Sequence, residues 1–175
     1  SNKKIKLTLN YSNLSKNDRD IIKKASILSQ KQILTFNDLI EFDEIKTSLK
    51  FIQKKYNIPL ERLLSFIKSQ IFIPISIFNK KLTVLEAIVK YLKEEKNFSL
   101  HQIAEAIGRD ERNIWHILKQ ARNKYQKKFV IKSIKYSIPI LIFSQNLSAL
   151  ESIVKYLKEE FSLSYHEIAG LLERN

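Results

Sequence analysis

Basic and amide side chains gather between residues 109 and 135, and these residue types suit a polyanionic ligand. Nine Lys and Arg stand here against two acidic residues, Asp110 and Glu111. Ammonium and guanidinium groups neutralise nucleic-acid phosphates, and Arg and Asn also form paired hydrogen bonds with guanine and adenine. The residues that we expect to contact double-stranded DNA are Arg109, Arg112, Asn113, His116, Lys119, Gln120, Arg122, Asn123 and Lys124.

The spacing of apolar residues places most of these side chains on one helix. Apolar residues recur every three or four positions, which predicts a helix over 111–126. Its inward face comprises Ile114, Leu118, Ala121 and Tyr125. The opposite face carries Arg112, Asn113, His116, Lys119 and Asn123. Trp115 adjoins the inward face, and we expect it to pack against a strap or a neighbouring helix.

The position of each polar residue along this helix predicts its role. The N-terminal end of such a helix enters the major groove first, so Arg112 and Asn113 are predicted to contact bases. Phosphate contacts position the protein without specifying sequence. They are predicted for Arg109, Lys119, Arg122 and Lys124.

Other chemistries find little support in the sequence. The 175 residues carry a net charge of +13 and no cysteine, which excludes disulfides, thiol catalysis and cysteine zinc sites. His101 and His166 lack further ligands at metal-binding spacing. The pairs Glu94-Glu95 and Glu159-Glu160 are interpreted as a solvated helix face. We therefore expect neither an enzyme nor a cofactor. With no apolar run of about 18 residues, we expect no membrane contact and a cytoplasmic location.

An internal repeat organises the C-terminal part of the chain. Residues 73–110 align without gaps with residues 138–175, and 21 of the 38 pairs are identical. Only two glycines and three prolines occur in the whole chain, which favours a mainly α fold with short β straps. Each copy begins with an apolar stretch around proline (73–78 and 138–143), which predicts an edge strand or an extended strap.

Two helices with recognisable starts follow each strap. Capping-box spacing joins Thr83 to Glu86 and Ser99 to Gln102, and the second copy repeats both at Ser148 and Ser164. Gly108 suits a tight corner because glycine accepts positive φ, and Asp110 is a predicted N-cap. Ala104, four residues before Gly108, allows a close approach between helices. This spacing is that of a helix-turn-helix unit.

On these residues the chain resembles a known family. Leu82-Thr83, Leu85-Glu86 and Leu92 are followed by Ser99, Ile103-Ala104, Ile107-Gly108, Ile114, Leu118 and Ala121. This series resembles the helix-turn-helix of region 4 of bacterial sigma factors and of response-regulator DNA-binding domains. It is also similar to small helix-turn-helix modules of archaeal transcription regulators. The resemblance covers residues 82–128 and, incompletely, 147–175. It implies DNA binding through the third helix.

The second copy departs from this pattern. Glu173 stands where the first copy has Gly108, and the sequence ends at Asn175, where a third helix would begin. We favour a natural protein that is longer than this chain. The apolar side chains of Ile168, Leu171 and Leu172 must then be shielded from solvent by a strap, another copy or a second chain. Residues 138–175 carry a net charge of −2, unlike the basic remainder.

The N-terminal part shows other patterns. Residues 4–11 alternate polar and apolar side chains, which predicts a strand, and helices are predicted over 18–34, 43–56 and 59–69. Residues 126–137 alternate from Phe129 on and predict a linking strand. Three domains are expected. Residues 1–70 contain a strand and helices, with the rhythm of a degenerate helical repeat. Residues 71–128 contain a strap and the first helix-turn-helix copy, and residues 129–175 contain a linking strand, a strap and two helices of the second copy.

Together these features favour a sequence-specific DNA-binding transcription regulator with tandem helix-turn-helix units. Two alternatives stay open: a protein–protein adaptor or assembly module built from such repeats, and the DNA-binding part of a transposase or recombinase. The partners considered besides DNA are a second copy of the chain and RNA polymerase.

Overall fold

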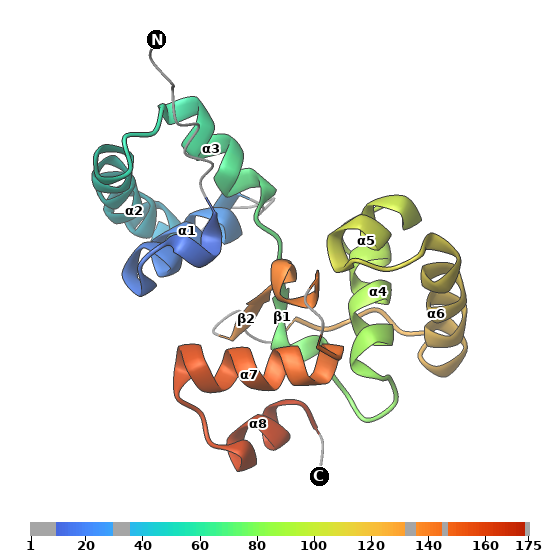
Figure 1. The fold of residues 1–175 in the computed structure, drawn as a ribbon. Helices are drawn as coiled ribbons and strands as arrows, with labels where there is room; N and C mark the ends of the chain where they lie inside the picture. Colours follow the sequence, from blue (N-terminus) through green and yellow to red (C-terminus); the bar gives the residue numbers. More distant parts are fainter. Residues whose placement is uncertain (1–9, 30–35, 132–135, 145–146, 174–175) are drawn as a thin grey trace. The chain divides into compact units, whose positions relative to one another are not determined.

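The structure is a computed structural model that describes residues 10–29, 36–131, 136–144 and 147–173. It divides into two units, with the boundary between Ile71 and Phe72. The first unit contains the short 3-10 helix η1 (Tyr11–Asn13) and three helices, α1 (Lys16–Ser29), α2 (Phe36–Lys55) and α3 (Leu60–Ser69). Both copies of the repeat lie in the second unit (Figure 1).

The second unit follows the repeat element by element. The first copy forms β1 (Phe72–Pro74), η2 (Ile75–Ile77), α4 (Val84–Glu94), α5 (Leu100–Ile107) and α6 (Glu111–Lys124). The second copy forms β2 (Ser137–Pro139), η3 (Ile140–Ser144), α7 (Ala149–Phe161) and α8 (Tyr165–Leu171). The predicted mainly α class is confirmed, together with a small antiparallel pair of strands.

The helices of the first unit differ from the predictions at their ends. Helix α1 starts at Lys16 because the Ser15 hydroxyl accepts the Asp18 N–H and caps it. Helix α2 starts at Phe36, well before the predicted residue 43. Of the predicted strand 4–11, residues 4–9 lie outside the described residues. Tyr11 lies in the turn η1, where the Asn10 side chain accepts the Ser12 N–H. Residues 30–34 of the predicted helix 18–34 are also outside the described part.

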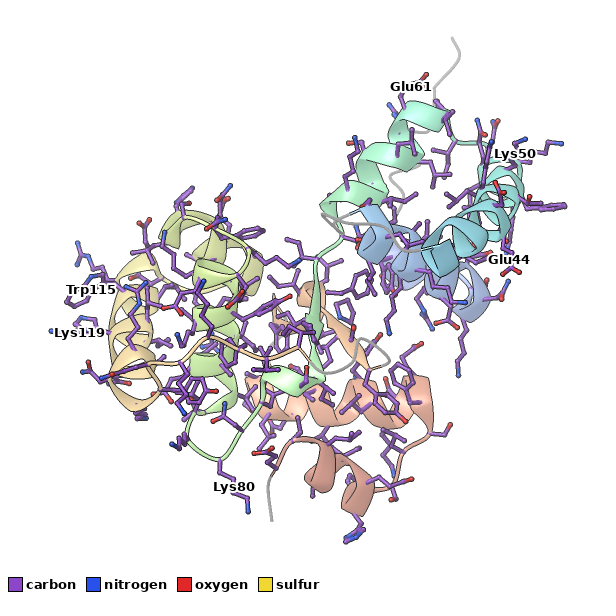
Figure 2. The ribbon with its side chains drawn as sticks, turned by 180° about the vertical axis from the view of Figure 1, so that it is seen from behind. Glu44, Lys50, Glu61, Lys80, Trp115 and Lys119 are labelled. Carbon is purple, nitrogen blue, oxygen red and sulfur yellow. The ribbon has the colours of Figure 1, made fainter. Side chains whose placement is uncertain are left out.

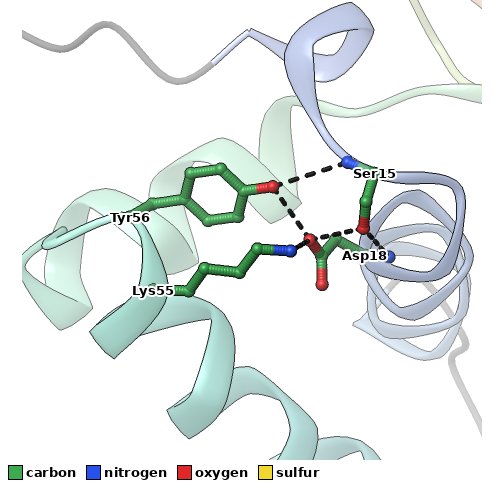
Figure 3. A network of polar contacts seen from close by, with 4 residues as sticks. All are labelled: Ser15, Asp18, Lys55 and Tyr56. Atoms are coloured by element: carbon green, nitrogen blue, oxygen red, sulfur yellow. Dashed lines mark hydrogen bonds and ion pairs between the residues drawn. The ribbon is translucent and has the colours of Figure 1, made fainter.

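A buried carboxylate joins α1 to the end of α2 (Figure 3). The Oδ2 atom of Asp18 accepts hydrogen bonds from Ser15 Oγ at 2.6 Å, from Lys55 Nζ at 2.5 Å and from the Tyr56 hydroxyl at 2.8 Å. Burial alone would raise the pKa of Asp18, but the bonds from Lys55, Ser15 and Tyr56 outweigh it and hold this pKa below its ordinary value. The network therefore fixes α2 on α1 with Asp18 ionised.

Replacing Asp18 with alanine is expected to lower the free energy of unfolding of the first unit by about 2 kcal/mol, because Tyr56 and Lys55 lose their shared acceptor. Lys55 is half exposed, so water can solvate its ammonium group and offset part of the loss of this ion pair. Hydrogen exchange of the α1 amides measures the effect. Asp20→Ala on the same helix is the control, since Asp20 is exposed. Equal protection of α1 in both variants would refute the role of the network.

The helix starts of both copies form as the spacing predicts. Thr83, Ser99, Ser148 and Ser164 each accept the backbone N–H three residues on, and the side chain there returns the bond, so all four capping boxes are present. Gly108 ends α5 with φ 63°, and the Asp110 side chain caps α6. The local sequence thus fixes where these helices begin and how α5 turns into α6.

The two straps pair with each other. Strands β1 and β2 are antiparallel, with Ile73 opposite Ile138 and Pro74 opposite Ser137. Ile73 and Ile138 are equivalent in the two copies, so a local twofold axis relates the paired strands. After the strands, η2 packs against α4, and η3 packs against α5 and α7. The predicted strand from Phe129 is wrong for Phe129–Ile131, which have no regular structure; residues 132–135 lie outside the described part.

At Glu173 the second copy has the same left-handed backbone as the first copy has at Gly108. Glu173 has φ 52°, close to the φ of 63° at Gly108, although a side chain disfavours this left-handed backbone. The Glu173 N–H donates to the Gly170 carbonyl at 3.2 Å, and the side chain is exposed. The backbone at Glu173 is therefore left-handed against the intrinsic preference of a residue with a side chain.

The strain at this corner predicts a stabilising substitution. Glu173→Gly is expected to raise the free energy of unfolding by about 0.5–1 kcal/mol, and the reverse change at the equivalent site, Gly108→Ala, to lower it by about 1 kcal/mol. Thermal unfolding followed by far-ultraviolet circular dichroism compares the two. A Glu173→Gly protein that melts at or below the parent temperature would contradict the argument.

Candidate nucleic-acid interface

Helix α6 is fixed by one apolar face that packs against α4 and α5. Ile114 and Ala121 are fully buried and Leu118 nearly so, as the spacing predicts. The helix ends at Lys124, two residues before the predicted end, because Tyr125 adopts an extended backbone. The half-buried Tyr125 ring stacks on Phe129, with ring centroids 5.6 Å apart. Because the apolar face of α6 is buried, the opposite side of the helix is exposed to solvent.

All nine residues predicted to contact DNA have exposed side chains. Arg112, His116, Lys119 and Asn123 recur at the spacing of one helix face, directly opposite the buried stripe. Within the described part of the chain, Arg109, Arg112 and Asn113 form no side-chain hydrogen bond or ion pair. The start of α6 and the corner before it thus present two guanidinium groups and an amide to an incoming ligand.

Trp115 lies at the edge of this surface. We expected it to pack against a strap or a neighbouring helix, but 47% of the residue is exposed. The straps pack on α4, α5 and α7 instead. The ammonium group of Lys119 lies 5.2 Å from the centroid of the indole ring, and the His116 ring meets it edge-on. Figure 2 shows Trp115 and Lys119 projecting outward from α6.

Two of the predicted phosphate contacts are engaged within the protein. Lys124 Nζ lies 2.6 Å from Glu86 Oε1, and Arg122 Nε lies 2.8 Å from Glu94 Oε1. Both cations are about half exposed, whereas the Glu86 side chain is almost completely buried. Arg122 and Lys124 therefore clamp the last turns of α6 onto α4. Their predicted phosphate contacts would compete with these ion pairs.

The roles of Glu86 and Glu94 in this clamp are predicted only in part from the sequence. Glu86 was identified as a helix cap and Glu94 as a solvated residue; the second interpretation is wrong, because Glu94 also pairs with the buried Lys90. The Lys90 ammonium lies 5.7 Å from the centroid of the Phe129 ring. The available signal was the spacing of Glu86, Lys90 and Glu94, which are four residues apart and share one helix face.

The clamp keeps both carboxylates ionised. Burial alone would raise the pKa of Glu86, but the bonds from Lys124 and from Thr83 outweigh it and lower this pKa. For Glu94, burial is likewise outweighed by the hydrogen bonds from Lys90 and Arg122, so its pKa is also below the ordinary value. Protonation of either carboxylate would weaken the attachment of α6.

Acid is therefore expected to destabilise the second unit. A carboxylate whose pKa is lower in the folded state contributes stability above the unfolded pKa, and this contribution is lost as the pH falls through the folded pKa. The loss begins below the ordinary glutamate value of 4.5. Urea unfolding followed by the fluorescence of Trp115, the only tryptophan, measures it at several pH values.

The double variant Glu86→Gln, Glu94→Gln should unfold more easily at pH 7 and depend less on pH between about 5 and 3. The matched control is Glu105→Gln, since Glu105 is exposed on α5. Identical pH profiles for the double variant and the control would show that the clamp is not the acid-sensitive element.

Other kinds of site have little support in the described residues. No group of three His, Asp or Glu side chains there could hold a metal ion. His101 instead lies 3.4 Å from Glu111 at the start of α6, and both residues are more than half exposed. No helix in the described ranges combines the length and hydropathy that a membrane crossing requires. The exposed face of α6 thus remains the strongest candidate interface.

Comparison with known proteins adds no further assignment. No protein-family model matches this sequence, and no curated protein or solved structure is similar enough to match it.

Proposed function

We propose that this chain binds double-stranded DNA in a sequence-specific manner and acts as a transcription regulator in the cytoplasm. The observation that carries the proposal is the division of α6 into a buried apolar stripe and an opposite face of Arg112, His116, Lys119 and Asn123. A helix held by one face and polar on the other is what major-groove recognition requires.

The arrangement of α5 and α6 supports this proposal. Gly108 turns the chain between the two helices, as expected for a helix-turn-helix unit, and leaves Arg109 exposed in the corner. Arg112 and Asn113 occupy the first turn of α6, from which side chains reach base edges. Arg109 and Lys119 flank them as phosphate contacts. In this proposal Arg122 and Lys124 primarily fasten α6 to α4.

Titration of the chain into labelled duplex DNA and into a matched RNA pool at several salt concentrations tests the proposal. With Arg109 and Lys119 on phosphates, the logarithm of the duplex association constant should fall with a slope of about −2 against the logarithm of salt concentration. Duplex should bind more tightly than RNA. Equal affinity for both pools, or a slope near zero, would overturn the proposal.

A further inference from the structure

Trp115 is the one large apolar side chain among the exposed residues of α6. Among the described residues, its ring interactions are with neighbours on α6 itself. The Lys119 ammonium lies 5.2 Å from the centroid of the indole ring, and the His116 ring meets the indole edge-on with the centroids 4.9 Å apart. The exposed part of the indole therefore contributes nothing to the attachment of α6 to its neighbours.

Trp115 stands in a row with two side chains that are predicted to contact DNA. It follows Arg112 by three residues and precedes Lys119 by four, and side chains at these spacings are neighbours on the surface of a helix. Arg112 and Lys119 are exposed, and Figure 2 shows Trp115 and Lys119 projecting from the same side of α6. A duplex that contacts both cations therefore also meets the indole.

The interactions of the ring prepare it for binding. A cation is attracted to the π-electrons of an indole, and an edge-on aromatic pair is a favoured geometry. Because Lys119 and His116 interact with the ring in these two ways, the side chain of Trp115 loses less rotamer freedom when a ligand binds. The indole is thus a preorganised apolar surface between the cations of Arg112 and Lys119.

Thymine is the base that offers an apolar group to such a surface. All base pairs present hydrogen-bonding groups in the major groove, and only thymine adds a methyl group there. An indole placed against the polar groups of another base would remove them from water without replacing their hydrogen bonds, which costs free energy. Contact with the thymine methyl instead removes apolar surface from water on both partners. The indole therefore favours thymine.

We propose that Trp115 is a specificity-determining residue that contacts a thymine methyl group in the major groove. The inference rests on the proposed binding of duplex DNA by α6, and it adds one recognised chemical group to that function. Since Trp115 lies less than one helical turn from Arg112, the thymine should stand within about two base pairs of the base that Arg112 contacts. Tightly bound sites should therefore carry thymine at a fixed position.

Replacing single thymines with deoxyuridine tests this contact, because the two bases differ only in the C5 methyl group. The probe is the duplex that the intact chain selects most tightly from the duplex pool, prepared with deoxyuridine at one thymine position at a time. At one position, the loss of the methyl group should weaken binding of the parent chain about 4-fold. Trp115→Ala should bind the thymine and deoxyuridine forms equally at that position, and Trp115→Phe should restore part of the preference.

Phe51→Ala is the matched control. It removes an aromatic ring that is 70% exposed on α2 of the first unit, so it should keep the full preference for thymine. The parent chain gives a second readout, because its fluorescence comes from Trp115 alone among tryptophans. Duplex binding should protect this ring from quenching by acrylamide. Circular dichroism checks that each variant is folded.

Three results would overturn the inference while DNA binding by α6 stands. Deoxyuridine could weaken binding at no position, or it could weaken the parent chain and Trp115→Ala equally. In the third result, acrylamide quenches Trp115 as strongly in the complex as in the free chain. Failure of the intact chain to bind duplex DNA is a different outcome, since it would overturn the proposed function and this inference with it.

Discussion

Replacing both Arg112 and Lys119 with alanine is expected to weaken duplex binding about 100-fold while the fold stays intact. A well-placed arginine contact with a base contributes about 1–3 kcal/mol, and loss of a phosphate contact reduces the salt slope by about 1. Both side chains are exposed, so their removal opens no cavity. Fluorescence anisotropy with the duplex pool at fixed salt measures the affinity, and a salt series measures the slope.

The control for this experiment is Lys80→Ala, which removes an exposed positive charge from the same unit away from α6 (Figure 2). It should change affinity less than about 3-fold, because one distant charge contributes little to binding. Should the double variant bind DNA as tightly as Lys80→Ala, the exposed face of α6 is not the interface. A loss of duplex affinity of about 100-fold with an unchanged circular dichroism spectrum would show that the double variant has lost contacts with DNA and not its fold.

Replacing Ile114 with alanine is expected to have the largest effect on stability. Ile114 is fully buried where α6 packs against α4 and α5, and truncation of such a residue costs about 2–5 kcal/mol. Urea unfolding followed by Trp115 fluorescence reports on this helix directly. The exposed polar face is unchanged, so the molecules that remain folded should bind duplex with nearly the parent affinity.

Ile117→Ala is the matched substitution for Ile114→Ala. Ile117 lies on the same helix and is only half-buried, so its truncation should cost markedly less. Equal costs at the two positions would show that the packing of α6 is not organised by the stripe of Ile114, Leu118 and Ala121. A large loss of duplex affinity in folded Ile114→Ala protein would mean that the position of α6, and not only its surface, is set by this side chain.

Local signals in the sequence determined much of this structure. The four capping boxes and the corner at Gly108 each depend on residues within four positions of one another, and such interactions form in nearly any tertiary context. The buried stripe of α6 follows from helix periodicity alone. The repeat, read as 21 identities in 38 pairs, correctly predicted that both copies would form equivalent helices.

Interactions between distant residues decided the rest. The pairing of β1 with β2, the clamp from Arg122 and Lys124 to α4, and the burial of Lys90 beneath Phe129 join residues 28 to 67 positions apart. Such contacts depend on which faces the packing brings together, and no local pattern encodes this. For the same reason, the sequence wrongly predicts that Trp115 packs against a strap or a neighbouring helix and that Glu94 lies on a solvated helix face. The side chain of Lys90 on α4 is buried beneath a ring that lies 39 positions away, because only tertiary packing determines which face of a helix is shielded from water.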